Sequence, residues 1–456
     1  MSQAINQVIP EGYKQTEIGI IPSEWSISQL GELVVITSGE SPSKFDFISE
    51  GVPYFKVEQL NNGNVYAEET EYRIKTKKTI PAGSIIFPKR GASILLNKIR
   101  MLKKDSFMDT NLMTLTCLPN LLDNMFLYNI LIYQGLDKVA DTTSIPQINN
   151  KHIIPFIIPI PVKAEQTAIA NALSDVDALL SELEQLIAKK QAIKTATMQQ
   201  LLTGKTRLPQ FAFYSDTNSP EGAVESKSKG IKPSELGEIP EDWEVTTIDN
   251  VISDLRGGAP FKPSDFTKSG IKVLPKGGVV KGGVLKVLEK DQQFCSKIWS
   301  SKYSKNCADS RYTIVVLRDL VPSGPSIGLM VSIPTDDKYV LAQGVYGFIA
   351  ENEETSRYLI QYSNTKEYRR AANEIMVGST QVHITNGAFK SLKIPFPPKT
   401  ERGLIATILS DMDNEIQTLE QRLSKTRQIK QGMMQELLTG KTRLPFDKDT
   451  RSEVSV

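Results

Sequence analysis

The sequence predicts an α+β fold in which two mixed α/β globular bodies form a tandem repeat and two long helices form a coiled coil. Three observations support this prediction. A chain of 456 residues is longer than one hydrophobic core usually supports. Two sequence segments each occur twice. Each copy is accompanied by a long run whose apolar residues have heptad spacing.

The repeat is the clearest feature of the chain. LLTGKTRLP stands at residues 201–209 and, unchanged, at 437–445, an offset of 236 residues (437 minus 201). GYKQTEIGIIPSEW at 12–25 aligns with GIKPSELGEIPEDW at 230–243, an offset of 218 (230 minus 12). The second copy therefore contains 18 additional residues between the two motifs (236 minus 218). Because one unit occurs twice, we expect one architecture to be used twice.

The TGKT core of the repeat is similar to the end of a phosphate-binding loop. That loop needs G-x-x-x-x-G-K-[ST] after a strand, but glutamines, Gln199 and Gln435, stand five residues before Gly204 and Gly440. Both copies also follow long helical patterns. We therefore expect these glycines to lie at helix ends, with the lysine that follows near the negative end of the helix dipole, and we expect no nucleotide site.

Two long helices are predicted at 161–205 and 399–440. Their apolar residues recur in steps of four and three, which indicates the narrow seam of a coiled coil and not the wider stripe of a helix on a globular core. The simplest arrangement pairs the two helices with each other and puts the bodies at opposite ends. Helices of another protein are the main alternative partner. The seam residues are Ile169, Leu173, Val176, Leu180, Leu183, Ile187, Ile405, Leu409, Met412, Ile416, Leu419 and Leu423.

The repeat and the helices together divide the chain. The predicted segments, in order, are an N-terminal motif (1–25), a first body (26–160), the central long helix (161–205), a connector with the second copy of the motif (206–249), a second body (250–398), the distal long helix (399–440) and a C-terminal tail (441–456).

Each body is expected to mix short strands with helices and to end in a proline-rich exit, IPIPVK in the first copy and IPFPPK in the second. Runs of β-branched and aromatic residues between Gly, Pro and Asn turns predict the strands. The strands are expected at 84–88, 112–118, 312–317 and 346–350, and helices at 126–140 and 356–376.

Composition favours a reducing compartment. Cys117, Cys295 and Cys307 are odd in number and far apart, which speaks against a disulfide framework. No apolar run approaches the length needed to span a bilayer. We therefore expect a cytoplasmic protein that does not interact with a membrane.

Patterns typical of catalysis or metal binding are absent from the sequence. It contains no HExxH, CxxC or GxSxG, and no [DNS]PP[YFW] tetrad of the kind that amino-methyltransferases use; PFPPK at 395–399 comes nearest to it. The cysteine spacing does not suit a zinc ribbon. The two histidines, His152 and His383, fall at nearly matching places before the exits, where a structural or polar role is expected. We predict no catalytic residue, no metal site and no cofactor in this chain.

Basic turns flanked by glycine favour a nucleic-acid partner. Residues 250–400 hold 21 Lys and Arg against 13 Asp and Glu, whereas residues 210–249 hold 3 against 9. Glycine lets a backbone approach a phosphate closely, and Lys or Arg can reach phosphate oxygens or the O6/N7 edge of guanine. The candidate DNA-contacting residues are Lys56, Lys89, Arg90, Gly91, Lys98, Arg100, Arg256, Lys276, Lys281, Arg318 and Ser323.

Taken in order and in duplicate, these motifs resemble the specificity subunit of Type I restriction and modification systems. The similarity covers nearly all of the chain. It rests on GVPYFKV, IPIPVKAEQTAIANALSDVD, IPFPPKTERGLIATILSDMD, the STQVHIT segment at 379–385, and LLTGKTRLP followed by GEIPEDW. One departure is IPQINNKHI at 145–153, which stands where the second body has TQVHIT. The resemblance implies two target recognition domains in a pseudo-twofold tandem repeat, separated by two long antiparallel coiled-coil helices.

The resemblance also implies a non-catalytic subunit. Such a subunit recognises a split double-stranded DNA target and directs two methyltransferase subunits and two restriction/translocase subunits to it. S-adenosylmethionine, ATP and Mg²⁺ would then belong to those partners. Two alternatives are a coiled-coil scaffold and a stand-alone DNA-modifying enzyme with divergent catalytic motifs. A scaffold would bind no duplex even with its partners present, and an enzyme would modify DNA without them.

Overall fold

The computed structural model describes residues 9–141, 145–214, 228–321, 323–334 and 337–445. The chain forms two compact units, the first made of Met1–Glu184 with Gln421–Val456 and the second of Gln185–Glu420. Parts of the predicted N-terminal motif, connector and tail, at 1–8, 215–227 and 446–456, lie outside the described residues.

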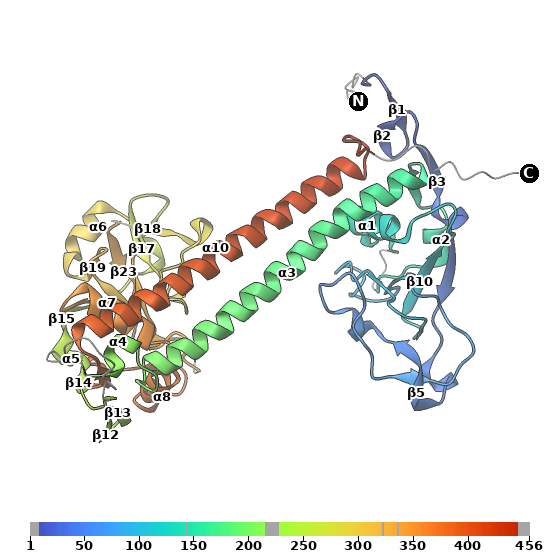
Figure 1. Cartoon of the computed structure of the whole chain (residues 1–456). Coiled ribbons are helices and arrows are strands. Elements are labelled where there is room, and N and C mark those ends of the chain that lie inside the picture. Colours follow the sequence, from blue (N-terminus) through green and yellow to red (C-terminus); the bar gives the residue numbers. More distant parts are fainter. Residues whose placement is uncertain (1–8, 142–144, 215–227, 322, 335–336, 446–456) are drawn as a thin grey trace, which may run out of the picture. The chain divides into compact units, whose positions relative to one another are not determined.

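The two long helices are α3 (Lys163–Leu201) and α10 (Lys399–Leu437), each of 39 residues (Figure 1). Each helix contributes one part to each unit, because the units divide α3 after residue 184 and α10 after residue 420. Long helices of this length were predicted, with ends that differ from the predicted ones by up to four residues.

Ion pairs show that α3 and α10 lie antiparallel within each unit. In the first unit Asp177 pairs with Lys430 at 2.6 Å and Glu184 with Arg427 at 2.6 Å, so the numbers rise along one helix as they fall along the other. The second unit has the same arrangement, with Lys190 bound to Glu415 and Lys194 to Asp413.

The apolar seam residues of both helices are covered to different extents. Eight of the twelve are buried and four are half-buried. The buried residues are Ile169, Leu173, Leu183, Ile187, Ile405, Leu409, Ile416 and Leu423, and the half-buried ones are Val176, Leu180, Met412 and Leu419.

The body of the first unit is built on two sheets. An antiparallel sheet has the order β4-β10-β7-β8 and a smaller one the order β6-β5-β9. The helix predicted at 126–140 is shorter, because it ends at Gly135, whose φ is +77°. The elements are β4 (Val34–Ser38), β5 (Phe47–Phe55), β6 (Arg73–Ile74), β7 (Ile85–Pro88), β8 (Arg100–Met101), β9 (Phe107–Met108), β10 (Leu112–Cys117), α1 (Asn124–Gln134) and α2 (Asn150–Ile153).

The body of the second unit repeats the first sheet and enlarges the second. Its four-stranded sheet has the order β15-β24-β20-β22, and its other sheet has five strands in the order β16-β18-β17-β23-β19. The strands are β15 (Ile252–Gly257), β16 (Phe266–Thr267), β17 (Ile271–Leu274), β18 (Gln293–Cys295), β19 (Cys307–Ala308), β20 (Thr313–Val316), β22 (Met330–Ser332), β23 (Tyr339–Leu341) and β24 (Val345–Ala350).

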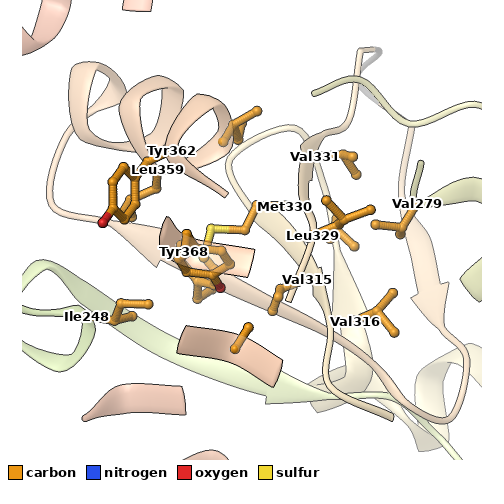
Figure 2. Packing of buried hydrophobic residues seen from close by; sticks show 14 of the residues in the cluster. Ile248, Val279, Val315, Val316, Leu329, Met330, Val331, Leu359, Tyr362 and Tyr368 are labelled. Atoms are coloured by element: carbon orange, nitrogen blue, oxygen red, sulfur yellow. The ribbon is translucent and has the colours of Figure 1, made fainter. Parts of the chain in front are cut away.

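The helix predicted at 356–376 is two helices, α7 (Glu353–Tyr362) and α8 (Lys366–Glu374). The Thr365 side chain accepts a hydrogen bond from the backbone N–H of Tyr368 and thereby caps α8 at its start. Both helices pack on the sheet, and Figure 2 shows Leu359, Tyr362 and Tyr368 beside Val315 and Met330 in this core.

Each core also includes the repeated motif and the long helices. Trp25, Phe126 and Leu173 belong to one buried cluster in the first unit. Trp243 and Leu409 belong to the main cluster of the second. In each unit, therefore, a copy of the motif, a body and parts of the long helices share one core, although the sequence shows them as separate segments.

The N-terminal motif folds as a hairpin in both copies. The first hairpin is β1 (Tyr13–Thr16) with β2 (Gly19–Pro22), and the second is β12 (Ile231–Ser234) with β13 (Gly237–Pro240). The next strand pairs with the proline-rich exit, which lies more than a hundred residues later. These pairs are β3 (Ser26–Gln29) with β11 (Ile157–Ile160) and β14 (Glu244–Thr247) with β26 (Lys393–Phe396).

The glycine of the TGKT repeat lets each helix end pack on the hairpin. Gly204 has a φ of +71° and Gly440 a φ of +72°, in the left-handed region that glycine favours. A Cβ at Gly204 would lie 2.4 Å from Cδ of Pro240, and one at Gly440 would lie 2.4 Å from Cδ of Pro22. The structure confirms the prediction that TGKT lies at a helix end.

A buried glutamate fastens the second unit at this point. Glu401, in the first turn of α10, is fully buried. Arg207 donates to both of its carboxylate oxygens at 2.6 Å and also to Asp242 at 2.8 Å, and Nε1 of Trp243 donates to Oε2 of Glu401 at 2.9 Å. We call the set of Arg207, Asp242, Trp243 and Glu401 the second clamp.

The first unit has an equivalent clamp, made of Glu24, Trp25, Glu165 and Arg443. Nε1 of Trp25 donates to Oε2 of the buried Glu165 at 3.0 Å, and Arg443 donates to both oxygens of that carboxylate. The hydrogen bond to Glu165 raises the pKa of the Arg443 guanidinium above its ordinary value. Glu165 and Glu401 are related by the offset of 236 residues, and so are Arg207 and Arg443. The arginine of each TRLP motif therefore joins the end of one long helix to the start of the other.

Candidate nucleic-acid interface

The same strand end occurs in both units. In the first, β7 leads into Lys89 and Arg90, and the Lys89 carbonyl accepts from the backbone N–H of Ile148 at 2.9 Å. In the second, β20 leads into Leu317 and Arg318, and the Leu317 carbonyl accepts from the N–H of Ile384 at 2.8 Å. Because β7 and β20 are the third strands of equivalent sheets, these two segments occupy equivalent places.

An exposed arginine lies at each of these strand ends. Arg90 pairs antiparallel with Gln147, and Arg318 pairs antiparallel with His383. Both arginines are exposed, whereas the strands before them are buried. We call Arg90 with Gln147 and Arg318 with His383 the strand-end sites. An exposed guanidinium held by a buried strand suits bidentate contact with a guanine edge.

The strand pairing also shows which residue of the first body corresponds to His383. His383 matches Gln147, at the offset of 236 residues, and does not match His152. His152 instead lies in α2, where its Nδ1 accepts from the backbone N–H of Asn149 at 3.1 Å. The first body therefore keeps the backbone pairing of the TQVHIT segment although its letters differ.

Lys89 and Gly91 flank the arginine in the first unit. Burial, together with the neighbouring Arg90 charge, lowers the pKa of the Lys89 amino group. Gly91 has a φ of +84°, and a Cβ there would meet no described atom within 4 Å. The backbone at Gly91 is therefore open to a close approach by a ligand such as a phosphate.

In the second unit, Lys276 and Ser323 lie close to Arg318 along the fold. Gly344 accepts hydrogen bonds from the N–H groups of Leu317 and Arg318, and a Cβ on that glycine would lie 3.4 Å from Cδ of Lys276. Ser323 is exposed on the turn that follows Arg318. The structure thus brings together candidates that are more than 40 residues apart in sequence.

Three other predicted residues make contacts within their own unit. The Lys56 amino group lies 3.5 Å from the centre of the Tyr72 ring, and Lys98 donates to Oδ1 of Asn61 at 2.7 Å. Arg256 forms an ion pair with Asp254 at 2.6 Å and donates to the Cys307 carbonyl at 3.1 Å. These contacts hold the three cationic side chains in place and limit how far they can extend toward a ligand.

Arg100 does not belong to the candidate interface. It lies in β8, is 8% exposed, and donates to the Ile99 carbonyl at 2.6 Å and to Oδ1 of Asn62 at 3.1 Å. Burial lowers the pKa of its guanidinium. These bonds engage the guanidinium of Arg100 with Asn62 and Ile99, which favours a structural role over the predicted contact with DNA.

Lys281 lies in a different part of the second unit, in a hollow of about 630 Å³. The residues around it are Asn364, Lys366, Arg369, Arg370, Asn373 and Glu374. The cations of α8 were not predicted from the sequence, because they stand about 90 residues from Lys281 in a helix that also carries acidic residues. This hollow is a second basic surface of the same unit.

Cys117, Cys295 and Cys307 are buried, and burial raises the pKa of each thiol, that of Cys117 to about 12. Among the described residues no group of three or more His, Cys, Asp or Glu side chains could hold a metal ion. In the same residues, none of the helices combines the length and apolarity that a bilayer span requires.

The duplicated sequence matches a known family, once in each copy. The sequence model of the Type I restriction modification DNA specificity domain matches residues 22–195 and again residues 240–428. The chain belongs to this family. Its role is accordingly non-catalytic recognition of DNA sequence within a Type I restriction-modification system, in which it works with other subunits. The scaffold and stand-alone enzyme alternatives find no support in this match.

Full-length relatives agree with this assignment. The Type I restriction enzyme MjaVIII specificity subunit of Methanocaldococcus jannaschii is 27% identical over 449 residues, which covers 95% of this chain and 96% of the relative. The putative MjaX specificity subunit of the same organism is 25% identical and covers 95% and 97%. A solved S subunit from M. genitalium covers 91% of this chain and 96% of its own, with a TM-score of 0.53 and 16% identity, and so supports the fold.

Proposed function

We propose that each unit recognises one half of a bipartite duplex DNA target through its strand-end site. The observation that carries this proposal is the repetition of one backbone arrangement that keeps the arginine and changes the side chains around it. Lys89, Arg90 and Gln147 in the first unit stand where Leu317, Arg318 and His383 stand in the second. Different side chains on one frame suit two unlike half sites.

The partners follow from membership of the family and from the resemblance of the motifs. In the proposal the chain directs two methyltransferase subunits and two restriction/translocase subunits to the target. Those partners bind S-adenosylmethionine, ATP and Mg²⁺ and carry out methylation and cleavage, so this chain needs no cofactor of its own. A protein that acts on DNA in this way would work in the cytoplasm.

Substituting the two strand-end arginines tests the proposal. Arg90→Ala is expected to weaken DNA binding by about 1–3 kcal/mol and to relax one position of one half site, because a bidentate contact with guanine is lost. Arg318→Ala is expected to do the same in the other half site. The measurements are the methylated sequence in cells that carry the complete system, and the Kd of the assembled complex on that duplex.

Two further substitutions serve as controls. Lys89→Ala should weaken binding to all sequences alike and reduce the salt dependence by about one ion if Lys89 contacts only phosphate. Arg311→Ala, an exposed arginine before the opposite end of β20, should change neither quantity. The proposal fails if Arg90→Ala and Arg318→Ala relax the same half site, or if both leave affinity and salt dependence unchanged.

A further inference from the structure

Two exposed aliphatic side chains follow the strand-end arginine in the second unit. Arg318 is exposed and Asp319 is buried in the short strand β21 (Arg318–Asp319), and Leu320 and Val321 follow in a bend. Leu320 is 59% exposed and Val321 is 49% exposed. Leu320 and Val321 thus follow the exposed Arg318 by two and three residues.

Buried polar groups hold this turn in shape. The Asp319 carboxylate accepts from the N–H of Leu320 at 2.7 Å and from Oγ of Ser326 at 2.6 Å. Burial opposes ionisation of this carboxyl, but the hydrogen bonds outweigh it and lower the pKa of Asp319 below its ordinary value. Arg369 of α8 donates to the carbonyls of Ile327 and Pro325. The exposure of Leu320 and Val321 is therefore a property of a braced turn.

The first unit presents an equivalent pair on an unrelated turn. After Arg90 the chain turns back through residues 91–97, with Ile94 buried and Leu95 and Leu96 exposed by 61% and 67%. Nδ2 of Asn97 donates to the Ile132 carbonyl of α1 at 3.3 Å and fastens the far end of the turn. Two turns with different sequences thus expose adjacent aliphatic side chains within six residues after the strand-end arginine.

We infer that these pairs contact the methyl groups of thymine in the major groove, next to the bases that the arginines contact. This inference rests on the proposed function. The thymine C5 methyl is the apolar group that base pairs present at the edge of the major groove, and apolar side chains recognise it by contact. Leu320 with Val321 would select an A·T pair in one half site, and Leu95 with Leu96 would select one in the other.

Exchanging thymine for deoxyuridine tests the inference, because it removes only that methyl group. The target is first mapped from the methylated bases of cells that carry the complete system. The assembled complex is then titrated with duplexes in which each thymine of either half site is replaced in turn by deoxyuridine. We expect one replacement in each half site to weaken binding about fourfold, as expected for one methyl group withdrawn from an apolar contact.

Variants of the chain assign each effect to its turn. The double variant Leu320→Ala, Val321→Ala should lose the discrimination between thymine and deoxyuridine in one half site and keep it in the other. Leu95→Ala, Leu96→Ala should do the reverse. Ile298→Ala, which alters an aliphatic residue of the second unit that is 85% exposed on α6 (Lys297–Lys302), should keep both. Because all of these side chains are exposed, the thermal unfolding midpoint serves as a check on folding.

Several outcomes would overturn the inference. Equal binding of every deoxyuridine duplex, a half site without an A·T pair, or full discrimination retained by both double variants would each do so. If these side chains instead inserted between stacked base pairs, every deoxyuridine duplex would bind equally. The fluorescence of a 2-aminopurine placed in the duplex would then change. If the complex did not distinguish the mapped target from other DNA at all, the proposed function itself would fail.

Discussion

Glu401→Ala is expected to destabilise the second unit by about 3–5 kcal/mol, the range for removing one member of a buried ion pair. The substitution leaves the Arg207 guanidinium without its main partner and removes the acceptor of the buried Trp243 N–H. Burying the Trp243 N–H without an acceptor, and the Arg207 guanidinium with Asp242 as its remaining partner, costs more than the pair itself contributes. The measurement is the free energy of unfolding in denaturant, followed by tryptophan fluorescence.

Controls for this substitution come from the same helix and from the repeat. Glu420→Ala, at an exposed position of α10, should change the free energy of unfolding by no more than about 0.5 kcal/mol. Glu165→Ala should destabilise the first unit as Glu401→Ala destabilises the second, because it breaks the equivalent clamp. An effect of Glu401→Ala no larger than that of Glu420→Ala would show that the clamp does not stabilise the unit.

Lengthening both long helices together is expected to change the spacing of the DNA target. Four residues inserted after Glu184 in α3 and after Glu420 in α10 lie where the two units divide, at positions related by the 236-residue offset. Four residues add about 6 Å at about 1.5 Å each and preserve much of the facing of the seam. At about 3.4 Å per base pair, the two half sites should stay the same while the spacer grows by one or two pairs.

The ion pairs explain why both helices must be extended. Glu184 with Arg427 lies entirely in the first unit and Lys190 with Glu415 entirely in the second, so paired insertions leave each of them intact. An insertion in α3 alone shifts one helix against the other and should lower stability. Sequencing of methylated bases gives the spacer length. An active complex with both insertions and an unchanged spacer would show that these helices do not set the distance.

Periodic features were predictable from the sequence because they depend on local chemistry. The seam from Ile169 to Ile187 is visible as heptad spacing, and β7, β10, β20 and β24 are visible as β-branched runs between turns. The break between α7 and α8 was missed, although Thr365 is a good capping residue, because the apolar pattern continues across it.

Contacts between distant residues could not be predicted in this way. The partners Arg207 and Glu401 are 194 positions apart, and nothing local marks Glu401 as buried. Arg100 lies in a basic run like those on surfaces, and only the packing of β8 shows that its guanidinium serves the fold. The match of Gln147 with His383 was available from the constant offset, but comparing the two histidines obscured it.

Each unit is expected to recognise its half site independently of the other. Exchanging residues 250–392 for the corresponding body of another family member tests it most directly, because β14, β26 and both clamps stay in place. The methylated bases are sequenced in cells that carry the complete system with the exchanged chain. We predict a target in which one half site is new and the other is unchanged, whereas a change in both half sites would show that the two units do not act independently.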